Sequence, residues 1–154
     1  MASERNATYA HWHRWALHLA GAGFRVMLFD YRGHAESTGR FEDFGPSDWS
    51  ADVRLCAGWL RARDREVPLV LHGLRLGALL AYDVFRGGVG DGLLMWSPPT
   101  TARDMLYAVM RLRLAADFAL PEGERRSRDD YVAELERGGT VEVDCFPWSG
   151  TCLL

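Results

Sequence analysis

The stretch Gly73-Leu74-Arg75-Leu76-Gly77 decides the predicted fold of this chain. An apolar run over residues 69–71 comes before it, and a run typical of a helix follows over residues 78–85. Two glycines spaced in this way allow a strand to turn sharply into a helix, so that the central side chain stands exposed above the sheet. The pattern therefore predicts a strand, a tight turn and a helix, with position 75 at the top of the turn.

Arg75 stands where the G-x-S-x-G form of this turn carries a serine nucleophile. A guanidinium stays protonated at ordinary pH and has no lone pair with which to attack a carbonyl carbon. The two glycines of the turn are present, but the serine nucleophile is absent. The sequence thus argues against serine-type acyl transfer at position 75.

Two interpretations of Arg75 remain open. In the first, its guanidinium binds a small anionic or acyl ligand beside a helix N-terminus, where exposed N–H groups favour negative charge. The residues of that ligand site are Gly73, Arg75, Leu76 and Gly77. In the second, Arg75 forms an ion pair with a strand-end carboxylate, Asp30 or Asp43, and holds the loops in place.

Length and composition predict one folded domain, residues 1–154, and not a disordered segment. Apolar residues make up 48% of the chain and include six tryptophans and seven phenylalanines. The net charge of −3, from 18 basic and 21 acidic residues, provides no field that favours nucleic acid. All the basic residues are arginine, which excludes Schiff-base and P-loop lysine chemistry.

The three cysteines indicate neither a disulfide framework nor a zinc site. Cys56, Cys145 and Cys152 are odd in number and show no C-x-x-C spacing. No metal and no cofactor are therefore expected. The N-terminus is polar, and no apolar stretch approaches the roughly 18 residues that span a bilayer. We expect a cytoplasmic protein with no membrane span.

Strand and helix patterns alternate along the first two thirds of the chain. Helices are expected from Asn6 or Thr8 to about Gly21, from Ser47 or Asp48 to about Leu60, and over 78–85; strands are expected over 24–29, 67–72 and 92–96. This order is typical of a parallel sheet with helices on both faces. Residues 24–29 are apolar without alternation, which predicts burial on both faces.

The pattern changes after Pro98-Pro99. Residues 102–120 and 128–137 have the apolar spacing of helices, and residues 140–143 alternate weakly, as a short edge strand does. The predicted fold class is therefore α/β, a partial parallel sheet flanked by helices, with a helical lid over residues 100–137.

Three segments together resemble the α/β-hydrolase superfamily in order and spacing: residues 30–37, the turn at Arg75, and the strand that ends in Trp96-Ser97-Pro98-Pro99. The run Gly-Leu-Arg-Leu-Gly-Ala-Leu-Leu-Ala over residues 73–81 is similar to that of the type 2 hydrolases associated with the exosortase A system, and residues 110–116 are similar to this family as well. The resemblance covers about residues 4–148. It implies hydrolysis of an ester or thioester and a role near exopolysaccharide production.

The resemblance also implies catalytic parts that this sequence lacks. Such hydrolases carry a serine, then an aspartate or glutamate, then a histidine. No histidine follows His72, and we expect the strands that precede the first helix in the family to be absent. We interpret the chain as a truncated member and a pseudoenzyme, with no identifiable catalytic triad.

Ser37 and Ser97, in predicted strand-end loops, are the candidates for a substitute nucleophile. A serine needs an adjacent general base, and His34 and His72 are the histidines nearest this edge; we expect His72 to be structural and His34 to lie in a flexible loop. Three alternatives therefore remain. The first is an active ester or thioester hydrolase whose serine lies outside the elbow, the name we use for the turn at Arg75. The others are a non-catalytic anion-binding or scaffold protein and a fragment with no stable fold.

Ala35 is expected in a turn with positive φ, at a cost of about 1 kcal/mol.

Overall fold

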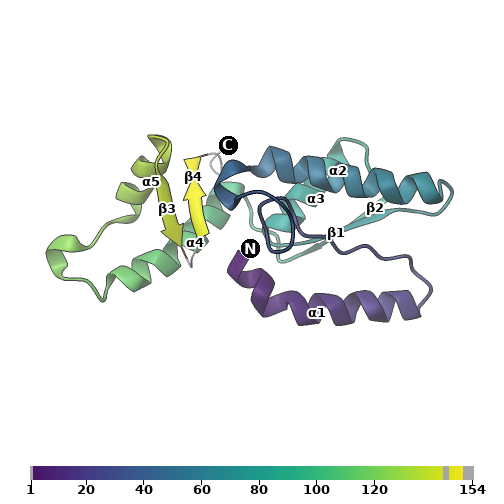
Figure 1. Ribbon diagram of the computed structural model, residues 1–154, viewed down its shortest axis with the longest axis horizontal. Helices are drawn as coiled ribbons and strands as arrows, with labels where there is room; N and C mark the ends of the chain where they lie inside the picture. The colour runs from purple at the N-terminus through teal and green to yellow at the C-terminus, as the bar shows by residue number, and fades with distance from the viewer. Residues whose placement is uncertain (1, 144–145, 151–154) are drawn as a thin grey trace.

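The computed structural model describes residues 2–143 and 146–150. In chain order its elements are α1 (Ala2–Gly21), the 3-10 helix η1 (Phe41–Asp43), α2 (Pro46–Arg63), β1 (Val70–Leu74), α3 (Leu76–Arg86), β2 (Gly92–Trp96), α4 (Ala102–Asp117), the 3-10 helix η2 (Glu122–Glu124), α5 (Arg128–Glu136), β3 (Thr140–Val143) and β4 (Phe146–Ser149). Figure 1 shows their arrangement. The fold class is α/β, as the sequence predicts.

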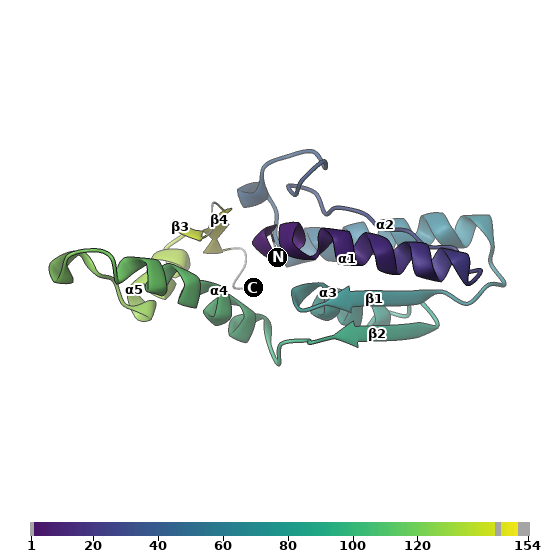
Figure 2. The same ribbon diagram turned by 90° about the horizontal axis from the view of Figure 1, so that it is seen from below.

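A pair of parallel strands, β1 and β2, forms the centre of the first half of the molecule. The helix α3 connects the two strands, and α2 packs against α3. Figure 1 and Figure 2 show α1 lying along this pair on the side away from α2 and α3. Helices therefore lie on both sides of the pair, and Leu94, Met95 and Trp96 of β2 are still 39–40% exposed.

Alternation along β1 distributes its side chains between the two sides. Leu71 is buried in a cluster with Val53 of α2 and Val84 of α3. The next residue, His72, contacts the indole rings of Trp12 and Trp15 in α1. Successive residues of a strand point to opposite faces, so Leu71 faces α2 and α3 while His72 faces α1.

The strand predicted over residues 24–29 is not observed. This segment is extended, but no strand of the described chain pairs with it. Phe24 is 61% exposed and Leu28 is 47% exposed, so the expected burial on both faces is wrong. An extended segment becomes a strand only where a neighbouring backbone supplies its hydrogen-bond partners. The parallel sheet therefore has two strands in the described residues.

Several element boundaries also differ from the sequence prediction. Helix α1 begins at Ala2, ahead of both predicted caps. The N-cap of α2 is Gly45, and the carboxylate of Asp48 accepts a hydrogen bond from the Gly45 N–H at 3.0 Å. Strand β1 begins later than predicted and extends to Leu74, because Leu74 pairs with Trp96 at the end of β2.

The predicted lid is helical. Helices α4 and α5 cover the two expected segments, and β3 pairs with β4 in an antiparallel hairpin. Strand β4 was not predicted, since its proline and flanking glycine resemble a loop. Figure 2 shows this half of the molecule beyond the carboxyl ends of β1 and β2.

One large hydrophobic core joins the lid to the rest of the molecule. Leu76 and Leu80 of α3 and Trp49 of α2 pack in the same cluster as Met105 of α4 and Leu135 of α5. The lid thus shares a buried surface with the helices that follow and flank the turn at Arg75.

Within the described residues, none of the helices has the length and apolar character that crossing a membrane requires. The same part of the chain holds no group of three or more His, Cys, Asp or Glu side chains arranged for a metal ion. Cys56 is a free thiol. Cys145 and Cys152 lie outside the described residues.

Candidate functional site

Arg75 occupies the top of the turn between β1 and α3, as the sequence predicts. Its backbone angles are φ 52° and ψ −117°, and it is the N-cap residue of α3. A non-glycine residue in such a conformation costs on the order of 1–3 kcal/mol. The Arg75 N–H donates to the carbonyl of Trp96 at 3.0 Å and so ties the turn to the end of β2.

The two glycines of the turn are not equivalent. A Cβ on Gly73 would overlap the backbone carbonyl of Gly77 and lie 2.5 Å from the amide nitrogen of Ala78. A Cβ on Gly77 would meet only the hydroxyl of Tyr31, at the ordinary distance of 3.8 Å. The close approach of strand and helix therefore requires glycine at position 73, whereas a Cβ at position 77 would be tolerated.

The side chain of Arg75 lies against the lid. Its Nη2 donates to the sulfur of Met105, in α4, at 3.7 Å. A thioether sulfur is a weak hydrogen-bond acceptor. Arg75 as a whole is half-buried, and its guanidinium lies where the turn meets α4.

A cavity of about 410 Å³ lies beside the turn. Its walls come from α1, from residues 27–31 with His34 and Glu36, from Trp49 of α2, from the end of β1 and from the first turns of α3. Three of the predicted ligand residues, Gly73, Leu76 and Gly77, line it. The fourth, Arg75, is not among the described lining residues, because its side chain extends towards α4.

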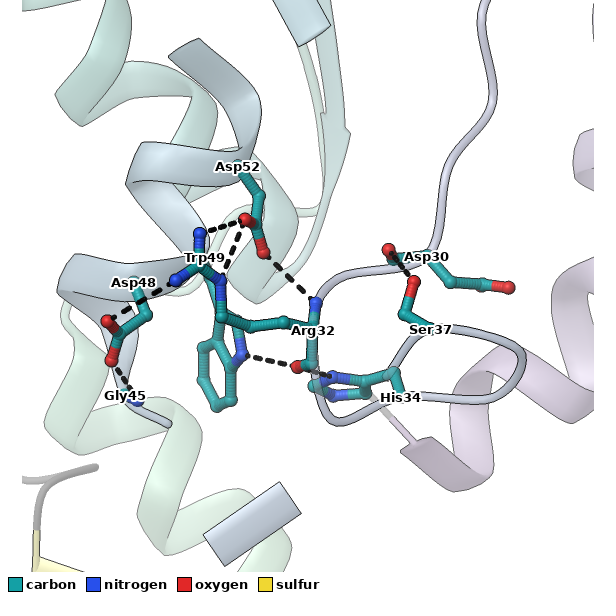
Figure 3. A network of polar contacts seen from close by, with 8 residues as sticks. All are labelled: Asp30, Arg32, His34, Ser37, Gly45, Asp48, Trp49 and Asp52. Atoms are coloured by element: carbon teal, nitrogen blue, oxygen red, sulfur yellow. Dashed lines mark hydrogen bonds and ion pairs between the residues drawn. The ribbon is translucent and has the colours of Figure 1, made fainter. Parts of the chain in front are cut away.

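Arg32 holds the loop after Asp30 against α2, as Figure 3 shows. Its Nε donates to Asp52 at 2.8 Å, its Nη2 lies 2.5 Å from the same carboxylate oxygen, and its backbone N–H donates to the other oxygen at 3.0 Å. The indole N–H of Trp49 donates to the Arg32 carbonyl at 3.2 Å. The sequence pattern gives no sign of this network, since the two charged partners lie twenty residues apart.

His34 is buried, and the expectation that it lies in a flexible loop is wrong. Only 8% of its surface is exposed. Its ring packs edge-on against Phe41 and Trp49 at centroid distances of 5.1 and 5.2 Å, and its Nδ1 lies 3.3 Å from the Arg32 carbonyl. Aromatic packing fixes this part of the loop. Ala35 has a φ of 46°, and the predicted positive φ is confirmed.

His72 lies in an aromatic cluster with α1 and β2. Its ring centroid is 4.4 Å from that of Trp96 and 4.8 Å from that of Trp12. Its Nε2 is buried and has no hydrogen-bond partner among the described residues. Burial lowers the pKa of His72, since removal from water disfavours the imidazolium. The imidazole is therefore neutral at neutral pH.

The two candidate serines have different surroundings. The Ser37 hydroxyl donates to the carbonyl of Asp30 at 2.6 Å. A hydroxyl has one proton to donate, so in this arrangement Ser37 does not donate to a histidine. Ser97 follows β2 directly, is exposed and has a φ of 43°.

Comparisons with known proteins give one family and one curated relative. Residues 4–122 match the family model described as serine aminopeptidase, S33. The lysophosphatidylserine lipase ABHD12 of Danio rerio is 31% identical to the chain over 91 residues. That match covers 56% of this chain and 23% of the relative, so it spans less than a quarter of the relative's length. No solved structure matches the chain.

Proposed function

The chain belongs to the serine aminopeptidase S33 family of the α/β-hydrolase superfamily, and from this premise we propose that it is a ligand-binding protein without acyl-transfer chemistry at its elbow. One observation carries the proposal. Arg75 occupies the strained position between β1 and α3, where the nucleophile of the G-x-S-x-G turn stands.

Serine-type hydrolysis needs a nucleophile, an adjacent general base and donors for the oxyanion. Arginine cannot act as the nucleophile, because its guanidinium carries no available lone pair. It supplies a fixed positive charge at the N-terminus of α3 instead. A carboxylate or a phosphate gains bidentate hydrogen bonds at such a place.

The proposed ligand carries an anionic group that binds Arg75. A carboxylate or a phosphate forms charge-assisted hydrogen bonds with a guanidinium, and these are stronger than a bond to a thioether sulfur such as that of Met105. Gly73, Leu76 and Gly77 line the cavity beside the turn, so a ligand that contacts them as well as Arg75 must extend from the cavity to the guanidinium at α4. The name of the relative, a lysophosphatidylserine lipase, supports an acyl ligand with an anionic head group.

Labelling with a serine-directed fluorophosphonate tests the loss of acyl transfer. We expect no labelling of the folded protein. Labelling that disappears in Ser97→Ala or in Ser37→Ala would contradict the proposal and favour the alternative, an ester or thioester hydrolase with a non-elbow serine.

Thermal unfolding with octanoate or inorganic phosphate tests the binding function. A ligand at a hundred times its Kd stabilises the native state by about 2.7 kcal/mol, which raises the Tm of a chain of this size by roughly 5–10 °C. The rise should be absent in Arg75→Gln and unchanged in Arg86→Gln, a control in the last turn of the same helix. A rise that persists in Arg75→Gln would refute anion binding at the elbow.

We further propose that the chain is related to the exosortase A-associated type 2 hydrolases, on the arginine-centred run over residues 73–81. The gene should then lie beside genes for an exosortase and for exopolysaccharide production. Sequencing of the flanking genomic DNA checks this, and a neighbourhood without such genes would count against it.

A further inference from the structure

We propose that α1 is a movable cover of the cavity beside the elbow, and that it leaves β1 and β2 while the rest of the molecule stays folded. Trp12 and His13 of α1 line this cavity, and its lining also includes Gly73 of the elbow. Departure of α1 therefore opens the cavity on that side. The movement is independent of an anion at Arg75, whose side chain extends towards α4.

Little buried surface holds α1 against the strands. Among residues 8–21 of this helix none is buried, and Tyr9 and Leu17 are 53% and 60% exposed. The shorter helix α3 buries Leu80 and Val84, among others. Segments with few buried apolar contacts open at a lower free energy than the core does. We therefore expect α1 to open before α3.

The contact between α1 and the strands contains two buried polar atoms. Trp12 lies 4.8 Å from His72 and 5.4 Å from Trp96, and Trp15 lies 5.5 Å from Trp96, all between ring centroids. The Trp15 Nε1 and the His72 Nε2 have no hydrogen-bond partner among the described residues. Such an atom has lost its bond to water without a replacement. Departure of α1 returns both atoms to water, and this hydration favours the open state.

The connection after α1 allows the movement. A Cβ on Gly21 or Gly23 would meet nothing within 4 Å, and Gly23 has a φ of 91°. Residues 24–29 follow as extended chain that pairs with no strand of the described residues, and Figure 1 shows them as an open stretch at the end of α1. The ion pair of Arg25 with Asp64, at 4.0 Å, is exposed and therefore weak. Backbone rotation at the two glycines thus moves α1 as a unit.

Hydrogen exchange at two indole N–H groups tests the proposal in the whole chain. NMR measures the exchange of Trp15 and of Trp49 at several urea concentrations below the unfolding transition. Trp49 is the matched control, because its indole is the same group in the large core, is 1% exposed and donates to the Arg32 carbonyl at 3.2 Å.

We expect Trp15 to exchange at least about tenfold faster than Trp49 and with a smaller dependence on urea, since departure of one helix exposes less surface than unfolding of the whole chain. Equal rates with equal urea dependence would overturn the proposal, because α1 would then leave only when the whole molecule unfolds. A Trp15 rate that does not depend on urea would overturn it as well, because exchange would then need no departure of the helix.

Variants assign the opening to α1. Trp12→Ala removes an aromatic ring from the contact and should accelerate Trp15 exchange by about tenfold or more, with Trp49 unchanged. Leu17→Ala, at an exposed position of the same helix, is the control and should exchange as wild type does. Leu135→Ala weakens the large core and should accelerate Trp49 alone. Acceleration of both indoles by Trp12→Ala, or of neither, would refute α1 as a separately opening cover.

Discussion

At the scale of single residues, backbone conformation and close packing decide what the turn at Arg75 tolerates. Arg75 adopts φ 52° although it carries a Cβ, and Gly73 lies so near the backbone of Gly77 and Ala78 that no Cβ fits. Strain of this kind persists only where the surrounding structure holds it. Here the hydrogen bond to Trp96 and the packing of α3 provide that support.

Gly73→Ala should destabilise the protein by about 3 kcal/mol or more, because its Cβ overlaps backbone atoms that cannot move without shifting α3. Gly77→Ala is the matched control. It should be neutral or stabilise by up to about 1 kcal/mol, since alanine favours helix and meets nothing closer than the Tyr31 hydroxyl at 3.8 Å. Urea unfolding measures both. Equal losses in the two variants would contradict the geometry of the turn.

Burial of His72 should make stability depend on pH. Its pKa is lowered in the folded state from an unfolded value of about 6.5. Above that value both states are neutral and the contribution is fully present. As the pH falls below about 6.5, the unfolded state takes up a proton that the folded state resists, so the free energy of unfolding falls.

The measurement is the free energy of unfolding between pH 5 and pH 8. In His72→Phe, which keeps an aromatic ring between Trp12 and Trp96, the decline below about pH 6.5 should be shallower. His11→Gln, at an exposed position of α1, is the control and should follow wild type. An undiminished decline in His72→Phe would show that other groups cause it.

At the scale of elements, side-chain bonds to the backbone determine where the helices of the lid begin. The Thr101 hydroxyl caps α4 by accepting from the Asp104 N–H at 3.0 Å. Ser127 and Asp130 form a reciprocal capping box at α5, in which each side chain accepts from the other's N–H. In α2 the corresponding bond runs from the Gly45 N–H to Asp48, so Ser47 has no capping role.

Ser127→Ala should destabilise the protein by about 1 kcal/mol, because the Asp130 N–H loses its acceptor at the start of a nine-residue helix. Ser47→Ala should change stability by less than about 0.5 kcal/mol, as exposed substitutions usually do. Thermal or urea unfolding of both variants checks this. A larger loss in Ser47→Ala would restore Ser47 as the cap of α2.

At the scale of the whole molecule, one hydrophobic core connects α2 and α3, which lie beside the parallel strands, to the lid. Phe41 contacts Trp49 at a centroid distance of 5.7 Å and Trp148 of β4 at 5.3 Å. Leu76 and Leu80, just after the elbow, belong to the same cluster. Shared buried surface of this kind favours unfolding in one cooperative transition.

Leu135→Ala in α5 should cost about 2–5 kcal/mol, because the side chain is 1% exposed and leaves a cavity in that core. If the halves unfold together, hydrogen exchange in peptides spanning residues 70–96 should accelerate with it, although these lie outside the lid. Leu112→Ala, at a position 56% exposed in α4, is the control and should leave exchange unchanged. Faster exchange confined to the lid would show that the two halves unfold separately.

Features that depend on near neighbours in the chain were predictable. The turn at Arg75, the helices of the lid and the positive φ of Ala35 follow from local spacing and backbone sterics. Short-range preferences are enough for these features because each concerns residues within about one turn of helix or one tight bend.

Features that depend on distant partners came from the tertiary structure alone. Residues 24–29 read as a strand, yet extended backbone forms a ladder only where another strand supplies donors and acceptors. The burial of His34, the Arg32–Asp52 bond and the cavity that gathers Trp12, Asp30 and Trp49 likewise join segments far apart in sequence. The sequence by itself determined the turn and the absent nucleophile, and packing between remote segments determined which side chains surround them.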